Sequence, residues 1–207
     1  MRTLTKVIQQ NLTPEQALDL LKEGNKRFVN NIKANRDLLE QVNETSAGQY
    51  PFATILSCID SRTSAELIFD QGLGDIFSIR IAGNVLNDDV IGSMEFGCKL
   101  AGSKLLLVLG HTRCGAVTGA CNQVQLGKLT ALLEKIKPAI DQETETKTER
   151  NGKNQTFLRH VTENNIHLAV KEVHEQSPIL AEMENKGEIK IIGGLYDVDN
   201  GGVIFYE

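Results

Sequence analysis

Residues 103–111 read SKLLLVLGH and form the most apolar run in the chain. Residues 51–58, PFATILSC, are a second short apolar run, and DIFSIRIAG at 75–83 is a third strand candidate. Short apolar runs bounded by polar residues are typical of strands buried on both faces of a parallel sheet. The closing stretch, EIKIIGGLYDVDNGGVIFYE at 188–207, predicts a strand, a turn over 199–202 and a last short strand that adds an antiparallel edge.

Helical patterns separate these strand candidates. The first pattern begins at Thr13, a good N-cap that is followed by Pro14 and by Gln16, which completes a T-x-x-Q capping box. Residues 141–155, DQETETKTERNGKNQ, are interpreted as a solvated loop or an exposed helix end, without a function. Strands that alternate with helices predict one α/β domain around a mainly parallel sheet. The helices are expected over about 13–30, 64–71, 88–101, from 115 onward, 129–140, 157–175 and 178–186.

The composition limits the class of protein. The chain has 207 residues, of which 41% are hydrophobic and 24% charged, the usual balance of a globular domain. No apolar run approaches the ~20 residues that a membrane span needs. The net charge of −5 does not favour a nucleic-acid surface. Because the first residues, MRTLTKVIQQNLTPEQ, lack the apolar core of a secretory signal, a cytoplasmic protein is expected.

Two of the strand candidates end in side chains that can bind a metal. The run that begins PFATILS leads into Cys58, Asp60 and Arg62, and the run SKLLLVLG leads into His111 and Cys114. Ligands collect beyond the carboxyl ends of the strands in open α/β sheets, so both groups of side chains are expected at one site. Thiolate and imidazole are ligands that zinc prefers.

Three of these groups, Cys58, His111 and Cys114, are the natural ligand set, which leaves the fourth position of zinc open for water as in catalytic sites. Asp60 is either the fourth ligand or a neighbour that Arg62 holds in a two-pronged salt bridge, away from the metal. Either motif alone is more often structural than metal-binding. Their occurrence at two equivalent strand ends favours a metal site.

The remaining cysteines and the histidines of the last long helix have plainer interpretations. None of the cysteines lies in a C-x-x-C pair, and disulfides are not expected in a cytoplasmic chain. Cys98 and Cys121 lie in apolar helical stretches, which favours buried core thiols. For His160, His167 and His174 a surface or core role is favoured over proton transfer.

The motifs, taken together, resemble the β-class carbonic anhydrases over residues 13–206. The segments that carry the resemblance are CIDSR, HTRCGAV, QGLGDIFSIRIAGN and GSMEFGCKLAGSKLLLVLGH, at 58–62, 111–117, 71–84 and 92–111. The resemblance implies a single domain over residues 1–207. Within it, residues 1–48 would form a helical N-terminal arm and residues 49–207 the α/β core.

The resemblance also implies the chemistry. Cys58, His111 and Cys114 correspond to the residues that bind one zinc ion per chain in this family, and Asp60 and Arg62 correspond to its catalytic dyad. The implied reaction is the reversible hydration of carbon dioxide to bicarbonate and a proton by zinc-bound hydroxide. In that reaction, Asp60 accepts a hydrogen bond from the hydroxide and directs its lone pair at the substrate.

A substrate pocket follows from the same resemblance. Gln49, ahead of a Pro-Phe pair, and Phe77 match the plant-like branch of the family, which favours an open zinc position at and above neutral pH. The chain has no Trp, whereas the bicarbonate-inhibited bacterial branch carries one before its first motif. Phe96 stands where the family often has Tyr, so a hydroxyl is lost there. The implied substrate-binding residues are Gln49, Phe77, Ala82, Phe96 and Gly115.

Two other functions stay open on these motifs. One is a hydrolase of carbon disulfide or carbonyl sulfide on the same zinc scaffold. The other is a non-catalytic zinc or thiol module in which the metal holds the fold, although Asp60 and Arg62 argue against it. The family is at least dimeric, with the N-terminal helix around the partner and Gln49 reaching the partner's site. The expected partners are therefore carbon dioxide or bicarbonate and a second copy, in a homodimer or tetramer.

Overall fold

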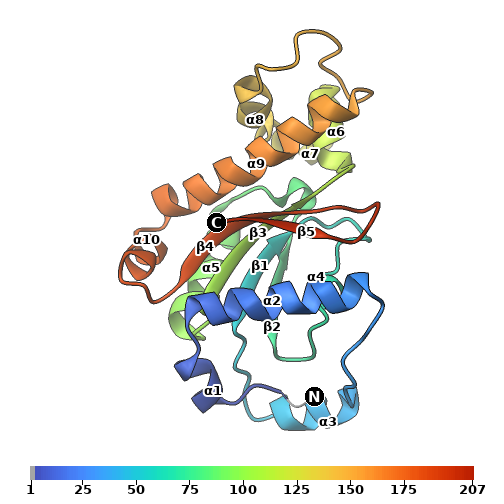
Figure 1. Cartoon of the computed structure of the whole chain (residues 1–207). Coiled ribbons are helices and arrows are strands. Elements are labelled where there is room, and N and C mark those ends of the chain that lie inside the picture. Colours follow the sequence, from blue (N-terminus) through green and yellow to red (C-terminus); the bar gives the residue numbers. More distant parts are fainter. Residues whose placement is uncertain (1–2) are drawn as a thin grey trace.

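The computed structural model describes residues 3–207, and its strands lie side by side in one twisted sheet (Figure 1). The strand order is β2-β1-β3-β4-β5. Strands β1 to β4 are parallel and β5 is antiparallel to β4, so the prediction of a mainly parallel α/β sheet is confirmed. The strands are β1 (Ala53–Ser57), β2 (Ile76–Arg80), β3 (Leu105–His111), β4 (Lys190–Tyr196) and β5 (Val203–Tyr206).

Helices connect the strands. In α2 the predicted capping box is present, because the Thr13 hydroxyl accepts the Gln16 N–H at 3.2 Å and the Gln16 side chain accepts the Thr13 N–H at 2.9 Å. The helices are α1 (Lys6–Asn11), α2 (Pro14–Val29), α3 (Leu38–Thr45), α4 (Ala65–Ile68), α5 (Asp88–Glu95), α6 (Gly115–Cys121), α7 (Gly127–Glu134), α8 (Lys137–Gln142), α9 (Gln155–Gln176) and α10 (Pro178–Asn185), with a 3₁₀ turn η1 (Ala82–Asn84) and a π-helical turn η2 (Phe96–Leu100).

Each face of the sheet packs against its own set of helices, because apolar side chains of the central strands point alternately to the two faces. On one face, α2 and α4 bury residues such as Leu21 and Ile68 against Ile55 of β1 and Leu107 of β3. On the other face, α5, α9 and α10 cover the alternate strand residues, and Met94 of α5 is fully buried there. A third cluster, formed by α6, α8 and the start of α9, lies next to Cys58 and Cys114.

Several element boundaries differ from the prediction. The helix expected over 129–140 is two helices, α7 and α8; Pro138 has no N–H to donate, so an uninterrupted helix through it would lose a hydrogen bond. The helix expected over 64–71 is the single turn α4, which ends before Asp70 with its φ of 44°. The helix expected over 88–101 is α5 followed by the turn η2.

The segment 141–155 is more ordered than a solvated loop. Its Glu143 side chain is only 1% exposed and forms an ion pair with Arg150. Glu143 Oε1 also accepts the Thr146 N–H at 2.8 Å, and the Arg150 guanidinium lies over the ring of Phe157, 4.8 Å from its centroid. A buried carboxylate inside the segment therefore fixes a course that the polar sequence does not indicate.

The predicted N-terminal arm, residues 1–48, corresponds to α1, α2 and α3 over the described residues; residues 1 and 2 lie outside them. Within this segment α2 belongs to the core, since Ala17, Leu18 and Leu21 are buried against the sheet. Over residues 3–207, no helix combines the length and the apolar character that crossing a bilayer requires.

The register of the central strands sets the position of the site. Ser57, the last residue of β1, pairs with Leu109 of β3. Cys58 follows directly after β1, and His111 is the last residue of β3. Since the two strands are parallel, both side chains lie at the carboxyl edge of the sheet.

Candidate metal centre

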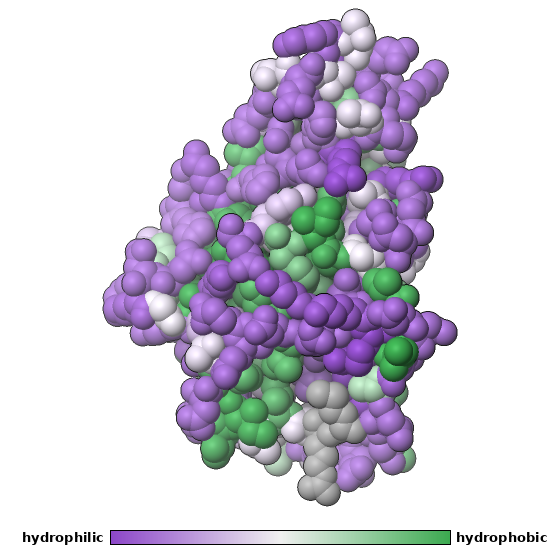
Figure 2. Space-filling model, viewed as in Figure 1, coloured by the Kyte–Doolittle hydropathy of each residue, from purple (hydrophilic) through white to green (hydrophobic). Residues whose placement is uncertain are grey.

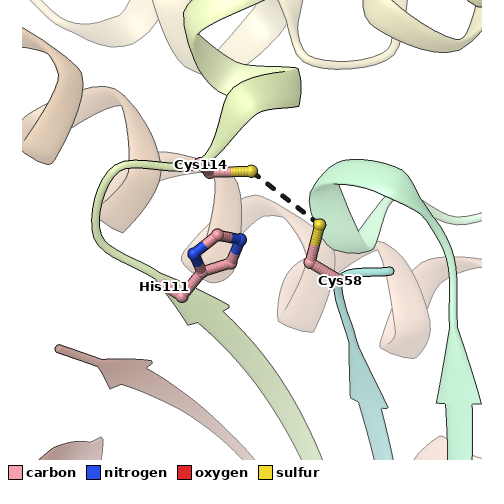
Figure 3. A group of neighbouring side chains, drawn as sticks. All are labelled: Cys58, His111 and Cys114. Carbon is pink, nitrogen blue, oxygen red and sulfur yellow. Dashed lines mark hydrogen bonds between the residues drawn. The ribbon is translucent and has the colours of Figure 1, made fainter. Parts of the chain in front are cut away.

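Cys58, His111 and Cys114 converge on one point at the carboxyl edge of the sheet (Figure 3). Their ligand atoms all lie within 4.8 Å of one another, and all three residues are buried. Cys58 comes from the end of β1, His111 from the end of β3, and Cys114 is the N-cap of α6. The structure therefore brings together the three residues that the sequence predicted as ligands.

The two sulfurs share a hydrogen bond at 3.9 Å. The pKa of Cys58 is lowered to about 4: the hydrogen bond from Cys114 is the main cause, burial opposes it, and His111 and the Gly83 N–H, 3.3 Å from Cys58 Sγ, lower it further. The same hydrogen bond and burial raise the pKa of Cys114. The hydrogen bond therefore favours a thiolate at Cys58, and a metal that took both sulfurs as thiolates would displace the proton of Cys114.

The His111 ring is oriented as a metal ligand. Its Nδ1 lies 2.9 Å from the Thr112 carbonyl oxygen, which fixes Nδ1 as the protonated nitrogen and leaves the lone pair on Nε2. Among the described residues, Nε2 is buried without a hydrogen-bond partner. A buried nitrogen lone pair beside two sulfurs is costly unless a further group binds it, and a zinc ion is a group that matches this donor set.

Asp60 is held beside this cluster and is not one of its members. The Arg62 guanidinium donates from Nε to Oδ1 at 2.9 Å and from Nη2 to Oδ2 at 2.8 Å. Asp60 Oδ2 lies 4.0 Å from His111 Nε2. Of the two roles that the sequence left open for Asp60, the structure has the carboxylate bound by arginine.

Arg80 and Thr63 support the loop that carries Cys58 and Asp60, and the sequence analysis missed both. Arg80 donates to the Cys58 carbonyl at 3.0 Å and to the Asp60 carbonyl at 2.6 Å. The Thr63 hydroxyl donates to the same two carbonyls, at 3.0 and 2.8 Å. The available signal was positional: Arg80 is the last residue of β2 and pairs with Ser57, so it lies at the edge that carries the site.

The five predicted substrate residues do not gather around one centre within a single chain. Ala82 precedes Gly83, whose N–H contacts Cys58, and Gly115 follows Cys114 as the first residue of α6. Gln49 lies before β1, at the opposite end of that strand from Cys58.

Phe77 and Phe96 also lie away from the metal centre of their own chain. Their rings contact each other with centroids 6.0 Å apart. Phe77 pairs with Thr54 in the sheet, about 13 Å along β1 from Cys58 at ~3.3 Å per residue. Gln49, Phe77 and Phe96 therefore lie on another part of the subunit, away from its own metal centre.

Cys98 and Cys121 are buried core thiols, as predicted. Burial raises the pKa of Cys98 to about 12 and that of Cys121 to about 11, so neither is a reactive thiolate. The histidines of α9 are engaged elsewhere: His174 with Glu184, and His167 against the ring of Tyr206.

A metal-dependent α/β enzyme is the class of protein that this fold and this centre define. Residues 53–203 match the family model described as carbonic anhydrase. Over 200 residues the chain is 33% identical to carbonic anhydrase 2 of Mycobacterium tuberculosis, covering 94% of this chain and 93% of that protein. The chain therefore belongs to the β-carbonic anhydrase family, enzymes that hydrate carbon dioxide.

Solved structures of β-carbonic anhydrases have the same fold as this chain. The β-carbonic anhydrase CcaA superposes with a TM-score of 0.71 at 25% identity, over 92% of this chain and 95% of that one. A tetrameric β-carbonic anhydrase of the ascomycete Sordaria macrospora has the same fold, with a TM-score of 0.68 at 19% identity over 80% of this chain and 89% of that one. The resemblance, the fold class and the carbonic anhydrase function predicted from the sequence are thus confirmed.

Proposed function

We propose that Asp60, Arg62 and a zinc ion held by Cys58, His111 and Cys114 catalyse the reversible hydration of carbon dioxide to bicarbonate and a proton. The 4.0 Å separation between Asp60 Oδ2 and His111 Nε2 supports this most directly. It places an ionised carboxylate at the edge of the ligand cluster, where a reacting water can reach both. A metal that only held the fold together would have no use for such a neighbour.

One zinc ion per chain fits the residues present. Two sulfurs and one imidazole nitrogen are donors that zinc prefers, and the lone pair of His111 Nε2 is available. When bound, zinc supplies a nucleophile at neutral pH by lowering the pKa of water to ~7. Three protein ligands leave the fourth coordination position for that chemistry.

Asp60 acts as the hydrogen-bond acceptor for the nucleophile. The side-chain hydrogen bonds from Arg62, opposed by partial burial, hold the pKa of Asp60 well below its usual range. An ionised carboxylate has no proton to donate, so Asp60 accepts the O–H of the attacking water and leaves the lone pair of that oxygen directed at carbon dioxide. Arg62 keeps the carboxylate in place during attack.

We also propose that the site is completed by a second copy of the chain, in a homodimer or tetramer. Gln49 is exposed and Phe96 is 52% exposed, and neither lies at the metal centre of its own chain. Both can line a substrate pocket only in another subunit. A Gln49 side chain from that subunit would donate a hydrogen bond to a substrate oxygen, and Phe77 and Phe96 would give carbon dioxide an apolar wall.

Apolar surface near the N-terminus supports an assembly. Val7 and Ile8 of α1 are 66% and 48% exposed, and Leu100, the last residue of η2, is 77% exposed. Figure 2 shows apolar surface gathered below α2, in the region of α1. Extended apolar surface of this kind favours a protein contact. The tetramer in the Sordaria macrospora protein is compatible with the larger of the two assemblies.

A cytoplasmic location remains our proposal for the chain. The four cysteines are free and buried, which suits a reducing compartment.

The test is stopped-flow hydration of carbon dioxide by protein whose zinc content has been measured on the same sample. We expect hydration that scales with zinc content, and no comparable turnover of carbon disulfide or carbonyl sulfide. Zinc-loaded protein that turned over only the sulfur analogues would move the assignment to the hydrolase. Zinc-loaded protein without either activity would leave a structural metal.

A further inference from the structure

The backbone between His111 and Cys114 adopts a conformation that needs outside support. Arg113 has a φ of 55°, in the left-handed region that residues other than glycine visit rarely. Such residues persist where the surrounding structure holds them. Because the loop separates two metal-ligand candidates by only two residues, any change in its course would move Cys114 relative to His111.

A turn after β4 supplies that support. The Thr112 N–H donates to the Tyr196 carbonyl at 2.9 Å. The Thr112 hydroxyl donates to Asp197 Oδ1 at 3.1 Å and accepts the Val198 N–H at 3.0 Å. One hydroxyl therefore makes two hydrogen bonds to the turn, and the loop between the ligands is fixed on both its backbone and its side chain.

Hydrogen bonds within the turn hold its backbone in place. The Asp197 N–H donates to the Gly202 carbonyl and the Gly201 N–H to the Asp197 carbonyl, both at 2.8 Å. Asp197 Oδ2 accepts the Asn200 amide at 2.7 Å. The buried Asn25 of α2 also donates to the Gly201 carbonyl, at 2.9 Å. The support for the metal loop is thus anchored to the body of the domain.

The same loop contacts the catalytic pair. The Arg113 carbonyl accepts Arg62 Nη2 at 3.4 Å, and this nitrogen also donates to Asp60 Oδ2. The side chain of Arg113 pairs with Asp199 at 2.8 Å, but both partners are more than half exposed, so that ion pair contributes little. The backbone and hydroxyl contacts of Thr112, whose hydroxyl hydrogen bonds are partly buried, are the stronger connection.

We propose that Thr112 and Asp197 are positioning residues for the metal centre. Their hydrogen bond fixes the spacing of His111 and Cys114 and, through the Arg113 carbonyl, the place at which Arg62 holds Asp60. This inference rests on the proposed function, since it gives the turn a role in that same site. Groups that orient metal ligands from outside typically change metal affinity or activity by about 10- to 100-fold when removed.

The test uses Thr112→Val, which keeps the shape and removes the hydroxyl, and Thr112→Ser, which keeps the hydroxyl. Thr162→Val is the matched control, because it removes a buried hydroxyl that donates to the Leu158 carbonyl within α9 at 2.7 Å. Two quantities are measured: the rate of zinc release to a chelator, and kcat and KM for hydration. The first does not depend on activity.

For Thr112→Val we expect zinc release about 10-fold faster and kcat about 10-fold lower with KM little changed. Thr112→Ser should stay close to the wild type, and so should Thr162→Val. Wild-type zinc release and kcat in Thr112→Val would overturn the proposal, as would equal losses in Thr162→Val. If Thr112→Val does not fold, the same measurements are made on Asp197→Ala, with Asp197→Asn as its conservative partner.

A wild-type protein that binds zinc but lacks activity would contradict the proposed function, and zinc release would still decide the role of Thr112.

Discussion

The Arg62 guanidinium donates two hydrogen bonds to the Asp60 carboxylate, one to each oxygen, at 2.9 and 2.8 Å. The Arg62 backbone N–H adds a third, at 3.0 Å to Oδ1. A two-pronged arginine–carboxylate pair is among the strongest hydrogen-bonded arrangements of side chains. Oδ2, which Arg62 binds, is also the oxygen that lies 4.0 Å from His111 Nε2, so the position of Asp60 relative to a bound metal depends on Arg62.

We predict that Asp60→Asn keeps zinc and loses most hydration activity, by about 100-fold or more. The amide has the size of the carboxylate, but it carries no charge and can present a donor where an acceptor is needed. Arg62→Ala should act similarly, because it frees Asp60 to move. Zinc content and kcat are measured together on each variant. Zinc-loaded Asp60→Asn with a rate near that of the wild type would show that the carboxylate is not part of the mechanism.

A second prediction concerns pH. Arg62 lowers the pKa of Asp60 in the folded protein, so the ion pair is present above the usual carboxyl range and is lost only as pH falls below it. Asp60 therefore stays ionised at and above neutral pH, so we expect activity to rise with pH as the water that zinc activates ionises. We expect the Asp60–Arg62 pair to be intact at and above neutral pH.

Crystal structures at acidic and alkaline pH decide this. At low pH the competing ligand is neutral water, which binds zinc weakly and which a carboxylate can replace. We therefore expect Asp60 to bind zinc directly only at acidic pH. Asp60 bound to zinc at alkaline pH, with Arg62 released, would contradict the prediction.

The metal-binding residues were predictable from the sequence, and their supports were not. Cys58, His111 and Cys114 each follow an apolar strand signal, and the rule that parallel strands end at one edge brings them together. Thr112 and Asp197 are 85 residues apart, and nothing in either local pattern indicates that they meet.

The resemblance assigned Gln49, Phe77 and Phe96 to a substrate pocket and placed Gln49 in the partner's site. It did not say from which subunit Phe77 and Phe96 would come. The strand register shows that Phe77 lies well before the end of its strand. The course of 141–155 was missed because Glu143 looks like any other acidic residue of a polar segment, although its side chain is buried.

The third prediction concerns the ligands. Cys58→Ser and His111→Ala should each lower zinc content to a small fraction of the wild-type value, because two remaining donors hold zinc poorly and a serine hydroxyl is not ionised at neutral pH. Cys121→Ser is the control: it also replaces a buried cysteine, away from the cluster. Metal analysis after dialysis against a mild chelator gives the result. Full zinc occupancy in both variants would contradict the assignment of Cys58 and His111 as zinc ligands.

The fourth prediction concerns acid stability. The Asp70 carboxylate is 8% exposed and pairs with Arg27 at 2.5 Å and Arg36 at 2.7 Å. Burial opposes ionisation, but the hydrogen bonds from Arg27, the Ala34 N–H and Arg36 outweigh it and lower the pKa of Asp70. The pair therefore stabilises the fold above the usual carboxyl range, and this stabilisation is lost as pH falls below it.

Asp70→Asn should lower the free energy of unfolding at neutral pH by roughly 3 kcal/mol, because it removes the buried carboxylate charge that both Arg27 and Arg36 bind. Denaturant unfolding at neutral and acidic pH measures this, and the difference from the wild type should shrink in acid. Asp141→Asn, which breaks an exposed pair with Lys137, should change stability by well under ~1 kcal/mol. An equal loss in both variants would refute the role given to Asp70.

The last prediction tests whether one subunit completes the site of another. Gln49→Ala should lower kcat/KM by about 10-fold, the effect of one lost hydrogen bond, whereas Gln142→Ala at the exposed end of α8 should not.

His111→Ala chains lack a metal site but still carry Gln49. In a dimer that contains one chain of each kind, the intact metal site of the Gln49→Ala chain receives Gln49 from its partner. If the two chains assort randomly, half of the dimers are mixed and each has one complete site, so activity per chain should recover to roughly one quarter of the wild-type value. Co-refolding equal amounts of the two variants and measuring hydration gives the answer. If Gln49 acted within its own chain, mixing would give only half the activity of Gln49→Ala alone, and the proposed shared site would have to be abandoned.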